Sequence, residues 1–123
     1  MGRSRSATEG KVAVDLTIET QHSGSWTVLH VAGELDLHTA PALRDRISEV
    51  LDAGTSKLAI DLEHVGFMDS SSLGILVTAL KRIREKDGDL ALVGVNGSPL
   101  KVLSLTGIDR LMPMLASSAD LPE

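Results

Sequence analysis

Apolar and polar residues alternate where the folded part of the chain is expected to begin. Between residues 12 and 19 every second residue is apolar: Val12, Val14, Leu16 and Ile18. This period of two predicts a half-buried strand. Turn-forming residues 21–24 and a second β-rich run at 25–31 follow it, so the two runs predict a hairpin. Gly33–Asp36 then leads the chain out of the sheet.

Two later segments repeat apolar residues at helical spacing, and a third is marked by helix start and stop signals. The first spans Thr39–Ala53, with Thr39 as a possible cap and Pro41 in its first turn. The second runs from about Ser71 to Lys86, and its basic last half (Lys81–Lys86) is interpreted as a solvated helix face. The third starts at Ser98–Pro99 and ends at Gly107.

Strands are expected between these helices, at Lys57–Leu62 and Leu90–Val95, with a short edge strand within Leu111–Leu115. Residues 63–69 are expected to form a loop whose Val65 and Phe67 turn back into the core. The order predicts one α/β domain, a mixed sheet of four to five strands packed against three to four helices. The domain is expected at 12–115, with a flexible tail at 1–11 and a frayed one at 116–123.

Composition narrows the classes of function. The 123 residues include one Trp, one Phe, no Tyr and no Cys, and carry a formal net charge of −5. Nucleic-acid binding is not expected, because the chain lacks both stacking aromatics and a basic footprint. Disulfide and thiol chemistry is excluded. No apolar run is long enough to cross a bilayer and no signal peptide is evident, so we expect a cytoplasmic protein without a membrane partner.

Four small polar residues, Asp69–Ser72, stand between apolar runs at the start of the second helix. A helix needs one N-cap, and either Asp69 or Ser70 suffices, so capping explains only part of the stretch. The alternative is phosphorylation. A phosphoserine at a helix N-terminus meets the positive end of the dipole, and its charge of about −1.5 to −2 changes what can dock there.

Catalysis and metal binding are weakly supported. No G-x-S-x-G elbow surrounds the serines, and the four histidines show no spacing that identifies a base. The carboxylates are dispersed and no P-loop is present, so neither an enzyme nor a bound cofactor is expected. Asp36 is interpreted either as a local backbone acceptor in a turn or as part of a functional rim on the same edge as Ser70.

Three segments carry a resemblance to a known family: VAGELDLHTAPALRDRI (31–47), LAIDLEHVGFMDSSSLGILV (58–77) and GSPLKVLSLTGIDRLM (97–112). Together with the hairpin, the chain from Val12 to Leu115 resembles the STAS domain family, specifically bacterial anti-sigma factor antagonists. The resemblance implies a regulatory protein that binds a kinase-type anti-sigma factor, an ATPase related to histidine kinases, and so frees a sigma factor.

The resemblance also assigns residues. Ser70 matches the serine that the anti-sigma factor phosphorylates to break the complex, and a separate phosphatase reverses this step. Asp36 matches an aspartate near the partner surface and Asp69 the residue before the acceptor. The surface is completed by Ser71, Ser72 and Leu73, which are expected to contact the partner. ATP and Mg²⁺ would belong to the partner.

Two departures and one alternative accompany this interpretation. Ser72 stands where the family commonly has glycine, which adds a side chain at the expected interface and a third hydroxyl. The family also closes with a further amphipathic helix, for which the residues after Leu115 leave little room. The alternative is a STAS scaffold or transporter-associated subunit that uses the same surface without phosphorylation.

Overall fold

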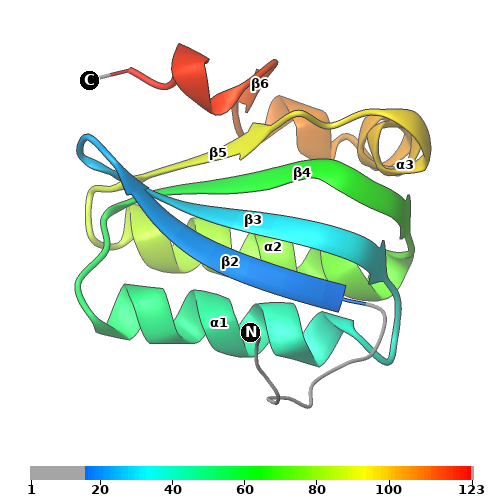
Figure 1. Cartoon of the computed structure of the whole chain (residues 1–123), viewed down its shortest axis with the longest axis horizontal. Helices are drawn as coiled ribbons and strands as arrows, with labels where there is room; N and C mark the ends of the chain where they lie inside the picture. Colours follow the sequence, from blue (N-terminus) through cyan, green and yellow to red (C-terminus); the bar gives the residue numbers. More distant parts are fainter. Residues whose placement is uncertain (1–15, 123) are drawn as a thin grey trace.

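A five-stranded mixed sheet organises residues 16–122, the part of the chain that the computed structural model describes. The strand order is β2-β3-β4-β5-β6, in which β2 pairs antiparallel with β3 and the remaining pairs are parallel. Helices α1 (Ala40–Asp52) and α2 (Ser70–Arg84) lie side by side against the sheet (Figure 1). Helix α3 (Gly97–Thr106) follows β5 and contacts β4. The predicted α/β class is confirmed.

The predicted hairpin is confirmed by strands β2 (Leu16–Ser23) and β3 (Trp26–Leu35). Gly24 in the connecting turn has a φ of 61°, a conformation that favours glycine. Strand β3 extends to Leu35, so the Gly33–Leu35 stretch belongs to the sheet instead of leaving it. The expected start of the first strand at Val12, and the expected tail at 1–11, lie outside the described residues.

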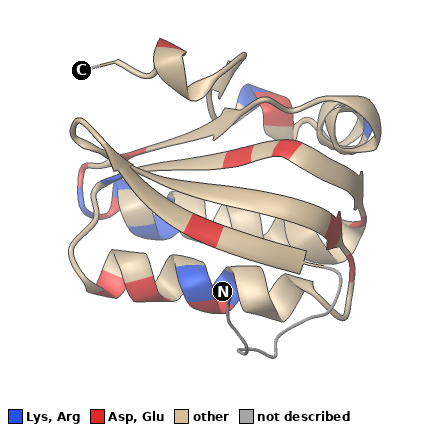
Figure 2. Ribbon diagram, viewed as in Figure 1, with Lys and Arg blue, Asp and Glu red and all other residues tan. Residues whose placement is uncertain are grey.

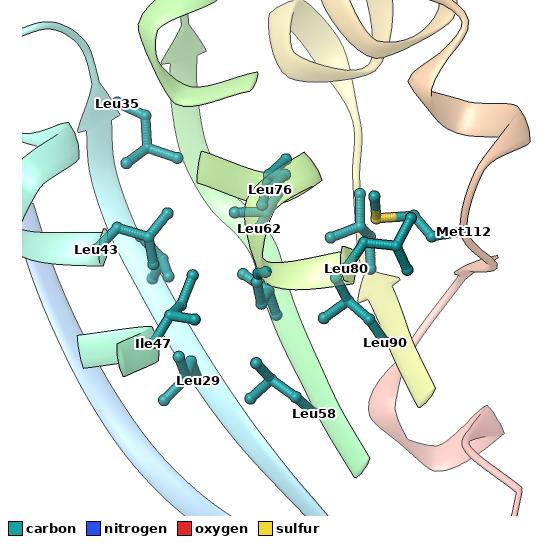
Figure 3. Close-up of a cluster of buried hydrophobic side chains, with 14 of the residues drawn as sticks. Leu29, Leu35, Leu43, Ile47, Leu58, Leu62, Leu76, Leu80, Leu90 and Met112 are labelled. Carbon is teal, nitrogen blue, oxygen red and sulfur yellow. The ribbon is translucent and has the colours of Figure 1, made fainter. Parts of the chain in front are cut away.

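The main core lies between the sheet and the helices (Figure 3). The helical stripes predicted from spacing supply it: Leu43, Ile47 and Leu51 of α1 and Leu76, Leu80 and Ile83 of α2 are all buried. Because all of these side chains are aliphatic, the core is held by close packing of branched chains without aromatic stacking. Gly107 ends α3 in the left-handed conformation with a φ of 82°, as predicted.

Strand β4 runs from Lys57 to Met68, so the loop expected at 63–69 is wrong. Its pairing with β3 shifts register twice, between His30 and Ala32 and between Gly33 and Glu34. Each shift places an extra residue on β4 and changes which side chains face the helices. Val65 is buried as expected, whereas Phe67 is 43% exposed and does not enter the core.

The other face of the sheet carries a smaller apolar cluster formed by Trp26, Val28, Ala59, Ala91 and Val93. Leu115 and Leu121 pack against it from the C-terminal segment. This segment contains β6 (Met114–Leu115) and two short 3-10 turns, Ile108–Arg110 before it and Ser118–Asp120 after it. Trp26 Nε1 donates a hydrogen bond of 2.7 Å to the Pro122 carbonyl. Leu121 and Pro122 therefore contact this side of the sheet, whereas most residues between Leu115 and Leu121 are exposed.

Acidic residues predominate on the strands, whereas helix α1 carries residues of both signs (Figure 2). Beyond Lys57 at the first position of β4, the ionised residues of β2, β3 and β4 are acidic: Glu19, Glu34, Asp61 and Glu63. The basic end of α2 is not simply solvated, because Arg82 donates to Asp52 at 2.8 Å and Lys86 donates to the Leu51 carbonyl of α1. Within residues 16–122, no helix is long and apolar enough to span a bilayer.

Candidate functional site

Two strand-to-helix junctions meet at one edge of the sheet. Leu35 at the end of β3 is paired with Met68 at the end of β4, and the Asp69 N–H donates to the Leu35 carbonyl at 3.0 Å. The residues that follow, Asp36 and Asp69, therefore emerge from neighbouring parallel strands at the same end. This confirms that Asp36 lies on the same edge as Ser70, where α/β sheets form ligand and partner sites.

Asp69 is the N-cap of α2. Its backbone is extended (φ −111°, ψ −179°) and its Oδ1 accepts a hydrogen bond of 2.9 Å from the Ser71 N–H. The Ser71 hydroxyl donates to the same oxygen. One carboxylate thus satisfies a free N–H of the first turn and fixes the neighbouring hydroxyl. Of the two residues that the sequence offered as cap, the structure uses Asp69 and leaves Ser70 free of that task.

The three serines have different environments. Ser70 is exposed at the first position of α2, Ser71 is half-buried and tied to Asp69, and Ser72 is fully buried. The Ser72 hydroxyl has no hydrogen-bond partner among the described residues. The expectation that Ser72 contacts a partner is therefore wrong for this conformation, because the third helical position turns its side chain into the core. Leu73 is half-buried and packs against the main core.

The β3–α1 junction is closed by its own hydrogen bonds. Asp36 Oδ1 accepts from the N–H groups of His38 and Thr39 at 2.9 and 3.0 Å. The buried Thr39 hydroxyl accepts from the Asp36 N–H at 2.9 Å and donates to the Glu34 carbonyl at 2.6 Å. Thr39 sits at the N-cap position of α1, but its side chain makes no cap bond, contrary to the predicted role.

These contacts change the acidity of Asp36. The hydrogen bond from the Thr39 N–H, followed by that from His38, stabilises the carboxylate and lowers the pKa of Asp36 below its ordinary value of 3.8. The side chain is consequently a firmly ionised acceptor engaged with its own loop. Of the two interpretations of Asp36, local backbone acceptor and rim residue, the structure is consistent with both, because the loop itself lies on the rim.

Two exposed apolar side chains accompany this edge. Leu37 in the β3–α1 loop is 70% exposed, and Phe67, one residue before Met68, is 43% exposed. No pattern in the sequence singles out Leu37, and the expectation that Phe67 enters the core is wrong. Large apolar side chains in water beside polar groups are typical of surfaces that bind other proteins. Acidic residues Glu34, Asp36 and Asp69 supply the charges of this edge.

The edge offers no metal centre. In residues 16–122, no group of three His, Asp or Glu side chains is arranged to hold an ion. What the arrangement does present is one accessible hydroxyl, Ser70, at the positive end of a 15-residue helix. Such a position favours an added anionic group, because free N–H groups and the helix dipole face it.

Comparison with known proteins agrees with this architecture. The sequence model of the STAS domain matches residues 17–121. The chain belongs to the STAS domain family. An anti-sigma-B factor antagonist of Staphylococcus aureus is 33% identical over 99 residues, which cover 80% of this chain and 92% of that protein. An anti-sigma F factor antagonist of Paenibacillus polymyxa is 30% identical over 102 residues, covering 82% and 87%.

A solved structure agrees in three dimensions as well. The crystal structure of an anti-sigma factor antagonist from Mycobacterium paratuberculosis superimposes with a TM-score of 0.79 at 30% identity. The alignment covers 85% of this chain and 89% of the other. The fold of this STAS protein is therefore shared with a solved protein that is named as an anti-sigma factor antagonist.

Proposed function

We propose that this STAS protein is an anti-sigma factor antagonist that is switched by phosphorylation of Ser70. In its unmodified form it binds a kinase-type anti-sigma factor through the edge formed by the two junctions, and a sigma factor is released. The anti-sigma factor phosphorylates Ser70, which breaks the complex, and a phosphatase restores binding. ATP is bound by the partner, and the cycle takes place in the cytoplasm.

One observation carries the choice of Ser70: of the three consecutive serines, it is the exposed one. Ser71 would have to leave Asp69 before its hydroxyl could react, and Ser72 would have to leave the core. Ser70 begins the first turn of α2, on the edge shared with Asp36 and Leu37. Relatives that share the fold are named as antagonists of anti-sigma factors, which supports the class of partner.

The electrostatics of the edge explain how a phosphate would act. The helix N-terminus stabilises an added dianion, typically by about 0.3–1 kcal/mol, so the domain itself stays folded. The neighbouring ionised groups, Glu34, Asp36 and Asp69, are all acidic. A phosphate thus adds negative charge and bound water to this surface. A partner that docks there must remove water from Phe67 and Leu37. The binding energy falls, because a charge that is desolvated without a counter-ion is costly.

The site assignment is tested by incubating the protein with ATP and a kinase-type anti-sigma factor from the same genome, followed by peptide mass spectrometry. We expect one phosphate, on Ser70. Ser70→Ala should abolish incorporation, whereas Ser71→Ala should retain it. Phosphate found on Ser71 or Ser72 alone, or no incorporation at all, would contradict the assignment.

The switch is tested separately by measuring the dissociation constant for the same anti-sigma factor. Ser70→Asp should weaken binding by about tenfold or more. A carboxylate that loses water at the interface without a counter-ion costs roughly 1.4 kcal/mol or more of binding free energy. Ser104→Asp, an exposed serine on α3, serves as the matched control and should leave binding unchanged. Equal binding by the unmodified protein and both variants would argue against an electrostatic switch.

A further inference from the structure

The first turn of α2 contains a buried polar group that destabilises it. Ser72 is fully buried, yet its hydroxyl has no hydrogen-bond partner among the described residues. A hydroxyl that has lost water without gaining a partner raises the free energy of the conformation that buries it. Opening of the first turn returns this hydroxyl to water, so Ser72 favours the open turn over the closed one.

The composition of this turn weakens the helix further. Serine at its first three positions has only moderate helix propensity, and Gly74 just after them has a low one. Nothing lies within 4 Å of the place where a Cβ of Gly74 would stand, so packing does not require glycine there. The cap is also one-sided, because Asp69 accepts from Ser71 but Ser72 at the third position returns no bond, unlike the glutamate of a capping box.

Firm contacts on both sides limit how far an opening of the turn can spread. On one side, the Asp69 N–H donates to the Leu35 carbonyl of β3 at 3.0 Å and holds the end of β4 on the sheet. On the other side, Leu76 is fully buried in the main core (Figure 3). Between these two anchors Ser72 has the only buried side chain. Residues 70–75 therefore form a unit that can open while the rest of α2 stays folded.

We propose that opening of this turn presents Ser70 to the kinase, and that Ser72 and Gly74 set how often the turn opens. This step rests on the phosphorylation of Ser70 proposed above. Phosphoryl transfer requires the acceptor oxygen in line with the γ-phosphate, inside a site that surrounds both groups. In the closed turn the Ser70 side chain is exposed, but its backbone is fixed between the end of β4 and the helix. Opening frees the helix side, so the hydroxyl can extend into the active site of the partner.

Hydrogen exchange of the free protein measures the opening without any kinase. In an α-helix the amides of Leu73, Gly74 and Ile75 bond to the carbonyls of the first turn and its cap, so they exchange when the turn opens. They should be protected at least about tenfold less than the amides of Leu80 and Ile83, and low urea concentrations should hardly change their exchange rates. Equal protection and equal urea dependence along α2 would overturn the proposal, because the turn would then open only when the whole domain unfolds.

Two substitutions should close the turn by independent means. Ser72→Ala removes the unpaired hydroxyl, and Gly74→Ala raises helix propensity at an exposed position. Each should slow exchange of the first-turn amides about fivefold. The single-turnover rate of Ser70 phosphorylation, at saturating ATP and anti-sigma factor, should fall by the same factor. Thr78→Ala is the matched control, because it raises helix propensity at an exposed position beyond Leu76 and should change neither rate.

Ser72→Ala also separates opening of the turn from docking of the partner. Because Ser72 is fully buried, its dissociation constant for the anti-sigma factor, measured without ATP, should equal that of the unmodified protein. A loss of affinity that accounts for the slower transfer would assign Ser72 to docking and overturn the proposal. Transfer at the unmodified rate in variants whose exchange has slowed would overturn this inference alone. Absence of phosphate from Ser70 in every variant would contradict the function proposed above, and this inference with it.

Discussion

The two junctions at the candidate edge begin alike and end differently. Each follows a parallel strand, starts with an aspartate and leads into a helix that covers the sheet. At the β3–α1 junction, Asp36 and Thr39 engage each other and the loop backbone, so the polar side chains are used locally. At the β4–α2 junction, Asp69 alone caps the helix and Ser70 remains exposed.

The difference separates structural from functional polar residues. An aspartate after a strand is explained by the N–H groups it accepts from, and both junctions satisfy that need. A polar residue that remains exposed after the local hydrogen bonds are satisfied is free for chemistry with another molecule. Ser70 meets this condition, whereas Thr39 and Ser72 are buried.

The largest expected effect distinguishes Ser72 from Ser70. Ser72→Asp places a carboxylate in the core without a counter-ion and should lower the free energy of unfolding by about 3–5 kcal/mol. Ser70→Asp should change it by no more than about 1 kcal/mol, in the stabilising direction, because the charge meets the helix N-terminus. Urea denaturation measures both.

Ser72→Ala is the matched control for that pair. It removes a hydroxyl that has no hydrogen-bond partner among the described residues, so stability should stay within about 1 kcal/mol or rise. Similar losses for Ser70→Asp and Ser72→Asp would show that the two side chains do not differ in burial.

The second effect concerns the closed junction. Thr39→Val keeps the shape of the side chain but removes the hydroxyl that accepts from Asp36 and donates to Glu34. Leaving these backbone groups unpaired should cost about 1–3 kcal/mol in thermal or urea unfolding. Thr39→Ser retains the hydroxyl and should recover most of the loss. Equal stability for the valine and serine variants would assign Thr39 a packing role only.

The third effect concerns the open junction. Asp69→Ala removes the N-cap of α2 and should cost about 1 kcal/mol. Asp69→Asn keeps an oxygen acceptor and should cost less. Hydrogen exchange at the Ser71 amide, which donates to Asp69 in the structure, should speed up in the alanine variant first. Unchanged exchange there would mean that the cap bond is not formed in solution.

The smallest effect is the pH dependence contributed by Asp36. Its pKa is lower in the folded state than its ordinary value of 3.8, because the Thr39 and His38 N–H groups stabilise the anion. Its contribution is therefore complete above that ordinary value and is lost as the pH falls through the lowered folded pKa.

Comparison of the unmodified protein with Asp36→Asn tests this sign. The stability difference between the two should be constant between pH 5 and 7 and should shrink below pH 3.8. A difference that instead grows at acidic pH would mean that the carboxylate is destabilising in the folded state. Asp45→Asn, an exposed carboxylate on α1, provides a control for general charge effects.

Sequence periodicity predicted most of the helices and strands correctly, but it did not predict which residues of β4 face the core. Leu58, Ile60 and Leu62 alternate inward, and a continued alternation would bury residues 64, 66 and 68. The structure instead exposes residues 64 and 66 and buries Val65, and Met68 faces the core again, because two register shifts against β3 insert extra residues into the strand. A bulge leaves no mark in the apolar pattern, since any residue can occupy it. Phe67, which was expected to turn back into the core from a loop, lies on this strand and is exposed.

The packing of the C-terminal segment could likewise not be predicted from periodicity, because it depends on residues far away in the sequence. Its small and polar residues gave no helical or strand period, so fraying was expected. Its order comes from contacts with distant residues: Leu121 packs on the second-face cluster and Pro122 accepts from Trp26, 96 positions away. Periodicity within a segment does not report such contacts, because the partner surface forms only after the sheet has assembled.

The sequence by itself determined the α/β class, the hairpin, the three helices, the buried stripes of the first two helices, and a polar surplus at the start of α2. These follow from local periodicity and capping, which act within a few residues. Only the tertiary structure decided which polar side chain of that surplus faces water. Two features decided this: the register between β3 and β4, and the rotation of the first turn of α2. Together they place Ser72 in the core and leave Ser70 exposed to water.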